Sequence, residues 1–230
     1  MLEIDILAVI PEIISNSLQY SILKRAQQQQ HVSINIHQLR DWAINDYGQI
    51  DDAQYGGGAG MVLRCEPVYN AITDLQKNGN FDEIILTSPQ GKTFNQKTAN
   101  FLSIKNKILI ICGHYKGFDE RIKNFFKMTE ISIGDYVLTG GEIPALVIID
   151  SIVRLVPGVL NNETSALEDS FQDNLLSPPI YTRPAKFMGH DVPSILLQGD
   201  PYKIQEWRFE QSLEKTKNLR PDLLTDEGLI

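Results

Sequence analysis

Short apolar segments with the character of strands alternate along this chain with longer segments that have the periodicity of helices. The expected strands are residues 2–10, 32–39, 81–88, 107–112 and 128–133. The expected helices are residues 12–30, 65–78, 95–104, 118–125 and 142–155. Because such an alternation favours crossover connections, it predicts an α/β fold with a mainly parallel sheet.

The composition of the chain changes after the last of these helices. A Pro-Gly pair ends that helix, and residues 161–170 are polar, acidic and without periodicity. A helix start near residue 200 indicates that the chain then becomes mostly helical. We therefore expect one domain over residues 1–160, a flexible linker over 161–173 and a small helical C-terminal domain over 174–230.

Charge and residue usage exclude several classes of protein. The 21 Lys and Arg residues against 29 Asp and Glu give a net charge of −8, which argues against indiscriminate polyanion binding. No apolar run approaches the roughly 18 residues of a membrane span, and the acidic start does not look like a secretory signal. Cys65 and Cys112 fit a reducing compartment. We expect a cytoplasmic protein with no membrane partner and, since its four histidines lack ligand spacing, no metal site.

Two glycine-containing segments resemble phosphate-binding motifs but lack their spacing. Residues 88–93 end in Gly-Lys-Thr, yet Leu86 stands where a phosphate loop needs its first glycine. Residues 55–60 are glycine-rich without the G-x-G-x-x-G pattern of dinucleotide sites. By itself the second segment indicates a close backbone approach, either to a ligand or to a partner chain.

Two expected strands end in segments that combine glycine with polar residues, namely residues 112–121 and 133–142. Ligands of parallel sheets bind at the carboxyl ends of the strands. With a third strand end at residue 88, these segments could form one pocket whose main chain bonds a flat heterocycle, while Ile133 and Leu138 cover its faces. Tight turns without a ligand explain the same residues about equally well.

A series of longer motifs runs from one end of the chain to the other. In chain order they are RDWA from Arg40, DDAQYGGGAGM from Asp51, SPQG from Ser88, CGHYKGFDER from Cys112, SIGDYVLTGGEIPA from Ser132, RLVPGVL from Arg154, DSF from Asp169, YTRP from Tyr181, WRFEQSL from Trp207 and RPDLL from Arg220. Together they make the chain resemble the bacterial tRNA (guanine-N1)-methyltransferases of the TrmD family. The resemblance implies a SPOUT-type α/β domain with a deep trefoil knot, an exception to the rule that chains do not thread their own loops.

The same resemblance implies a cofactor and an assembly. The knot of the family binds S-adenosyl-L-methionine in a bent conformation. The residues expected to line its pocket are Ser88, Pro89, Gly113, Tyr115, Gly117, Ile133, Gly134, Asp135, Tyr136, Val137, Leu138, Gly140, Gly141 and Pro144. The family works as a homodimer with the active site shared between subunits, which places the glycine-rich segment near the interface.

The family transfers a methyl group to N1 of the guanine 3′ of the anticodon, tRNA position 37, and so supports reading-frame maintenance. This nitrogen carries a proton, so the reaction needs a base for the proton and a cation for the charge that develops on O6. Asp169 and Arg154 match the family positions with these two roles. The resemblance also implies that the C-terminal domain binds tRNA.

The chain departs from the usual family pattern at three positions. His114 stands where the family usually has arginine, Lys116 where it has glutamate, and Pro201 where it has histidine. The family glutamate is tied to magnesium dependence, so a Mg²⁺ requirement is open for this chain. Lys116 could instead pair with the carboxylate of the cofactor.

Two other functions stay open. One is a knotted RNA methyltransferase with another acceptor atom, such as a ribose hydroxyl, which would not need Asp169 as a base for a ring nitrogen. The other is a catalytically silent tRNA-binding dimer, motivated by His114 and Lys116, which would bind the cofactor poorly. Replacing Asp169 with Asn tests the first, and calorimetric titration with S-adenosyl-L-methionine tests the second.

Overall fold

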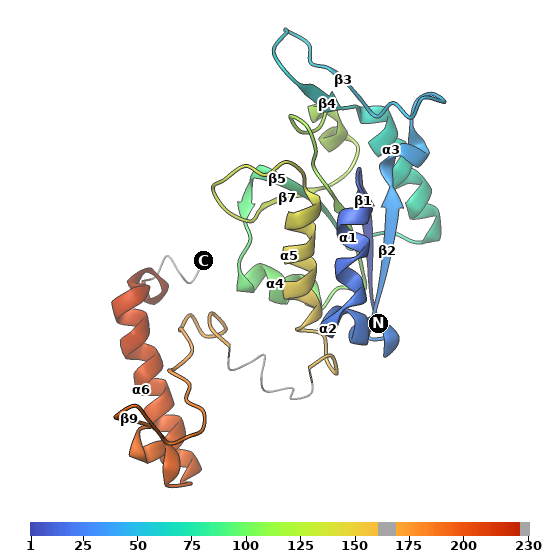
Figure 1. Ribbon diagram of the computed structural model, residues 1–230. Coiled ribbons are helices and arrows are strands. Elements are labelled where there is room, and N and C mark those ends of the chain that lie inside the picture. The colour runs from blue at the N-terminus through green and yellow to red at the C-terminus, as the bar shows by residue number, and fades with distance from the viewer. Residues whose placement is uncertain (161–168, 226–230) are drawn as a thin grey trace. The chain divides into compact units, whose positions relative to one another are not determined.

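The computed structural model describes residues 1–160 and 169–225, and the chain divides into two compact units, Met1–Glu163 and Thr164–Ile230 (Figure 1). Of the predicted linker, residues 161–168 lie outside the described residues, so its flexibility stays a prediction. Within the described ranges, no helix has both the length and the apolar character needed to cross a membrane.

The first unit contains a five-stranded sheet in which every neighbouring pair is parallel. Its strands are β1 (Leu2–Ala8), β2 (Val32–Gln38), β5 (Glu83–Thr93), β6 (Lys107–Ile111) and β7 (Thr129–Ser132). Their order across the sheet is β2-β1-β6-β5-β7. The prediction of an α/β fold with a mainly parallel sheet is confirmed, whereas the knot stays a prediction from the family resemblance.

Helices cover both faces of this sheet, so its inner strands are apolar on both sides. Alternate residues of β1 illustrate the division: Ile4 and Ile6 belong to one buried cluster and Leu7 to the other. The first cluster packs against residues of α1 (Glu12–Ser15), α2 (Ser21–Gln28), α4 (Gln96–Ser103) and α5 (Glu142–Val153). The second packs against α3 (Cys65–Leu75), which lies apart from α1, α2, α4 and α5 in Figure 1.

The predicted single helix over residues 12–30 is wrong. The structure has α1, a 3-10 turn at η1 (Ser17–Gln19) and α2, with a break at Tyr20, whose backbone is extended, and Ser21, which has a φ of 51°. The Gln27 amide partly offsets the loss of helical bonds there, because it donates to the carbonyls of Leu18 and Leu23.

The predicted helix over residues 118–125 is also shorter than expected. It is a 3-10 helix, η4 (Glu120–Asn124), capped by the Asp119 carboxylate, which accepts from the Arg121 amide.

The glycine-rich segment is the connection of an antiparallel hairpin that sequence analysis did not predict. The hairpin consists of β3 (Asp51–Ala53) and β4 (Met61–Leu63). Its second strand is held against a strand-end loop, since Lys116 N–H donates to Met61 O and Leu63 N–H to Gly117 O, both at 2.9 Å. A Cβ at Gly60 would lie 3.0 Å from the Lys116 side chain, so the close approach made here is to the same chain.

The described part of the second unit is built around one long helix, α6 (Pro201–Leu219), which begins near residue 200 as expected from the sequence. The Asp200 carboxylate caps this helix by accepting from the amides of residues 202 and 203. The buried Thr216 hydroxyl fixes the preceding chain to the helix, because it accepts from Leu176 N–H at 2.9 Å and donates to Ser212 O at 2.6 Å.

Three shorter elements complete the described part of the second unit. They are the hairpin of β8 (Lys186–Phe187) and β9 (His190–Asp191), η5 (Ser194–Leu197) and η6 (Pro221–Leu224). Sequence analysis did not predict the hairpin.

A buried charged cluster joins the first two strands of the sheet. Asp5 is only 3% exposed, and its carboxylate contacts His37 Nε2 at 2.7 Å, Asn35 Nδ2 at 3.2 Å and Lys107 Nζ at 3.7 Å. Burial alone would raise the pKa of Asp5, but the hydrogen bonds from His37 and Asn35 and the charges of His37 and Lys107 together lower it. The ionised carboxylate therefore stabilises the fold.

We expect Asp5→Asn to lower the free energy of unfolding at pH 7 by about 1–3 kcal/mol, because a charged hydrogen-bond acceptor is lost from a buried cluster. Since the folded-state pKa of Asp5 lies below its ordinary value of 3.8, the contribution is complete above that value. It is lost as the pH falls through the lowered pKa. Urea unfolding of both proteins between pH 7 and pH 2 measures the difference.

Asp74→Asn is the control, because this acid forms an exposed ion pair with Lys77 and its replacement is expected to change stability far less. A deficit of Asp5→Asn that is equally large at all pH values would contradict the role assigned to the charge of Asp5.

Candidate active site

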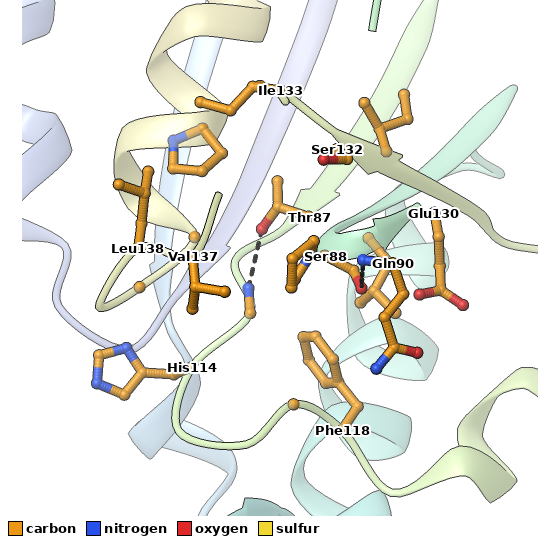
Figure 2. Close-up of a pocket in the computed structure, with 18 of the residues that line it drawn as sticks. Thr87, Ser88, Gln90, His114, Phe118, Glu130, Ser132, Ile133, Val137 and Leu138 are labelled. Atoms are coloured by element: carbon orange, nitrogen blue, oxygen red, sulfur yellow. Dashed lines mark hydrogen bonds between the residues drawn. The ribbon is translucent and has the colours of Figure 1, made fainter. Parts of the chain in front are cut away.

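A pocket of about 250 Å³ lies where β5, β6 and β7 end (Figure 2). Its walls come from residues 86–90, 113–118, 130–134 and 136–141, with Glu120, Lys123 and, from the first turn of α5, Pro144. The position follows from the topology, since the carboxyl ends of parallel strands present loops and unpaired main-chain groups at one edge of the sheet.

One wall of the pocket is a four-residue excursion within β5. This strand pairs with β7 through Thr87 opposite Ile131 and again through Lys92 opposite Ile131, so residues 88–91 leave the ladder, and residues 88–90 line the pocket. A Cβ at Gly91 would lie 2.5 Å from the carbonyl carbon of Glu130 and the nitrogen of Ile131. The glycine of the Gly-Lys-Thr segment thus permits a close approach to β7, which is unlike the role of a phosphate loop.

Three chain segments meet at the Thr87 hydroxyl. It donates to Ile111 O at 3.2 Å and accepts from Gly113 N–H at 2.9 Å, a bond drawn in Figure 2. Gly141 N–H donates to Gly113 O at 2.6 Å, and a Cβ on Gly141 would overlap the Thr87 hydroxyl and the Gly113 nitrogen. The loops after β6 and β7 therefore approach more closely than any side chain at residue 141 would allow.

A buried carboxylate lies behind the same loops. Glu142 is 1% exposed, and its Oε1 accepts from Val9 N–H at 3.2 Å and Ile10 N–H at 3.1 Å. Its Oε2 lies 3.9 Å from His114 Nδ1. Burial, assisted by the charge of Glu142, raises the pKa of the Cys112 thiol well above its ordinary value, so this cysteine is a neutral core residue.

The pocket is apolar on one side and charged at its rim. Figure 2 shows Val137 and Leu138 on one side, and Gln90 and Glu130 on the other. Lys123 lies at this rim and pairs with Glu120 at 2.7 Å and with Glu130. These bonds, that to Glu120 first, raise the pKa of Lys123, so its ammonium group remains charged. The arrangement suits a ligand with a flat apolar part and a polar or charged part.

The structure brings most of the predicted cofactor residues together. Those that line the pocket are Ser88, Pro89, Gly113, Tyr115, Gly117, Ile133, Gly134, Tyr136, Val137, Leu138, Gly140, Gly141 and Pro144. Asp135 is exposed and is not one of the lining residues. Arg154 forms the C-cap of α5, also outside the pocket lining, and Asp169 belongs to the second unit.

Several lining residues were not predicted from the sequence, namely Leu86, Thr87, Gln90, Phe118, Glu120, Lys123, Glu130, Ile131, Ser132 and Thr139. Most stand next to a predicted residue in the same strand-end motif, which is a signal that could have found them. Lys123 and Glu130 lie outside those motifs. His114 and Lys116, singled out as departures from the family pattern, line the pocket as well.

Comparison with known proteins gives a consistent picture over the whole chain. The family model described as tRNA (Guanine-1)-methyltransferase TrmD matches residues 2–226. A tRNA (guanine-N(1)-)-methyltransferase of Azobacteroides pseudotrichonymphae is 57% identical over 222 residues, 96% of this chain and 100% of that protein. Proteins of the same name from Christiangramia forsetii and Porphyromonas gingivalis are 55% and 52% identical, each over 98% of this chain and 100% of their own length.

We expect Gly141→Ala to lower the free energy of unfolding by about 1–3 kcal/mol, because the added methyl overpacks the junction at Thr87 although the φ of −88° suits alanine. The change should also weaken the hydrogen bond that Gly113 N–H donates to the Thr87 hydroxyl. Hydrogen exchange at the Gly113 amide, compared with amides of β6, measures this local effect.

Gly79→Ala is the control, since its φ of 117° strains an alanine but nothing lies within 4 Å of the added Cβ. It should destabilise the protein without selectively accelerating exchange at Gly113. Unchanged exchange at Gly113 in Gly141→Ala would show that the junction is not tightly packed.

Proposed function

Because the chain belongs to the tRNA (guanine-1)-methyltransferase family TrmD, we propose that it methylates N1 of guanine in tRNA, with S-adenosyl-L-methionine as the methyl donor. We propose that the methylated guanine is at position 37 of the tRNA and that the modification supports reading-frame maintenance. The proposed location of the enzyme is the cytoplasm. The observation that carries the proposal is the pocket at the ends of β5, β6 and β7, in which thirteen of the fourteen residues expected from the family motifs meet.

The residues of the pocket fit this donor. Glycines at the ends of β6 and β7 leave main-chain groups at the pocket to bond the edge of an adenine ring, while Ile133, Leu138 and Pro144 supply apolar contacts for its faces. The polar rim suits the amino-acid part of the donor. When bound, S-adenosyl-L-methionine supplies a methyl group on a positively charged sulfur, which keeps the electron pair of the broken carbon–sulfur bond.

The described residues do not offer a prepared Mg²⁺ site in this pocket. Its carboxylates Glu120 and Glu130 are both paired with Lys123. Across residues 1–160 and 169–225, no group of three or more His, Cys, Asp or Glu side chains is placed to hold a metal ion. We therefore derive no step through Mg²⁺.

The proposed chemistry assigns two roles to the chain. Asp169 accepts the N1 proton of guanine, which leaves the nitrogen lone pair free to form the new bond to the methyl carbon. Arg154 stabilises the negative charge that spreads to guanine O6. Asp169 is half-buried and precedes Ser170, whose hydroxyl lies 3.0 Å from the Ser177 hydroxyl and accepts from Ser177 N–H at 2.9 Å. These bonds hold the backbone next to the proposed base.

A homodimer with a shared active site is part of the proposal. Large apolar side chains are exposed around the start of α5, among them Ile143 and Val147 on the helix and Val137, which is 81% exposed, in the loop before it. Ile13 of α1 is exposed as well. A second copy of the chain that covers these side chains would remove them from water, and a two-fold interface is the usual arrangement. The second unit is proposed to bind tRNA.

We expect the protein to convert guanosine to 1-methylguanosine in an unmodified tRNA transcript with guanine at positions 36 and 37. Asp169→Asn should lower kcat by about 100-fold or more, because the base is lost. Arg154→Gln should lower it by about 100-fold through loss of charge stabilisation. Transfer of labelled methyl groups, followed by mass spectrometry of the nucleosides, measures both product and rate.

Asp173→Asn, another acid of the second unit, is the matched control and should keep its activity. A different methylated nucleoside would favour a knotted methyltransferase with another acceptor atom. If no methyl group is transferred with or without Mg²⁺, and calorimetry detects no S-adenosyl-L-methionine binding, a silent tRNA-binding dimer becomes the better explanation.

A further inference from the structure

A continuous stretch of the second unit, residues 180–191, is exposed at every position. Large apolar or aromatic side chains occur in it where a folded unit would normally bury them. Ile180 and Tyr181 begin the stretch, and Phe187 and Met188, exposed by 65% and 85%, lie at the hairpin of β8 and β9. We call residues 180–191 the hairpin surface.

The hairpin presents its apolar side chains at a tight turn. Phe187 pairs with His190, so the two-residue turn consists of Met188, with a φ of 47°, and Gly189, with a φ of 85°. Two positive φ values are typical of a type I′ turn, in which Asn-Gly is the favoured pair. A methionine is costly at the first position and gains no burial there. Turn geometry therefore does not explain why an apolar side chain occupies this position.

The charge of this region contrasts with that of the chain as a whole. The hairpin surface contains two basic residues, Arg183 and Lys186, and one acid, Asp191, so it carries a net charge of +1 in a chain whose net charge is −8. Both basic side chains are exposed, and Lys186 approaches the carboxylate of Asp191 only at 3.9 Å. The hairpin surface thus combines local positive charge with exposed aromatic and apolar side chains.

We propose that the hairpin surface binds unpaired nucleotides of tRNA, a contact that rests on the proposed function and extends it. Phe187 and Met188 lie against the faces of unstacked bases, and Arg183 and Lys186 bind the flanking phosphates. Protein recognition of RNA loops depends on this combination, because exposed bases offer flat apolar faces beside a negatively charged backbone.

A second protein is a poorer occupant of the same surface. A stable protein–protein interface covers about 800 Å² on each partner and is depleted of lysine at its core. The hairpin offers two neighbouring large apolar side chains beside a lysine, which is little area for such a contact.

The test uses the full-length protein and three single variants. Phe187→Ala removes the ring, Lys186→Gln removes one positive charge, and Met188→Asn removes the apolar side chain while it gives the turn its preferred Asn-Gly pair. Phe209→Ala is the matched control, because Phe209 on α6 is similarly exposed at 59% but lies outside the hairpin surface. The probes are a tRNA transcript and an RNA duplex without a loop, each titrated at several salt concentrations.

We expect Phe187→Ala and Met188→Asn each to weaken tRNA binding by about 10-fold and to leave duplex binding unchanged. Lys186→Gln should weaken binding to both probes and reduce the slope of log Kd against log salt by about 0.7–0.9. Phe209→Ala should bind like the wild type, and the Kd for S-adenosyl-L-methionine should be the same in all four variants.

Three results would overturn the proposal. The first is tRNA binding by Phe187→Ala and Met188→Asn equal to that of the wild type. The second is an equal loss in Phe209→Ala, and the third is a change in oligomeric state on ultracentrifugation with unaltered tRNA affinity. The third would assign the surface to a protein interface. Failure of the wild type itself to bind or methylate tRNA would instead count against the proposed function.

Discussion

The first unit depends on a contact that leaves no room for a side chain. Around the Thr87 hydroxyl, the ends of β5 and β6 and the start of α5 approach until Gly113 and Gly141 bond each other through their backbones. Two of the pocket walls meet at this point. Because the contact consists of main-chain atoms and one hydroxyl, it fixes those walls without the rotamer freedom of larger side chains.

The buried carboxylate of Glu142 extends this constraint to the end of β1. By accepting from the amides of Val9 and Ile10, it satisfies donors that the end of β1 would otherwise leave unpaired. The first turn of α5 is thereby bonded both to the segment that follows β1 and, through Gly141, to the loop after β6. The position of α5 relative to the sheet is thus fixed. This helix carries Pro144 of the pocket and has its C-cap at Arg154, the proposed cation.

An element or a site residue could be predicted from the sequence only where its signal lay within a short segment of the chain. The inner strand at residues 107–111 was predictable because burial on both faces requires a continuous apolar run. The end of β5 was not, since Pro89 and Gly91 indicate a turn, while the ladder resumes at Lys92 only because β7 lies beside it. The break at Ser21 and both hairpins likewise lack a periodic signal. At the site, motifs identified the glycine-rich strand ends, but the pairing of Lys123 with Glu130 joins residues from different elements and has no signature in the sequence.

Because β5 pairs with β7 both before and after its excursion, this pairing limits how a small molecule can enter and leave the pocket. The excursion at residues 88–91 is tied to the same neighbouring strand before and after it leaves the ladder, so this wall cannot swing outward as a hinged flap. The loop at 114–118 is bonded to β4 on its other side, so the part of the wall that can move is the loop at 134–140, whose Tyr136, Val137 and Leu138 are exposed. The rate at which a bound molecule leaves the pocket then depends on the movement of that loop, whereas β5 forms a fixed wall.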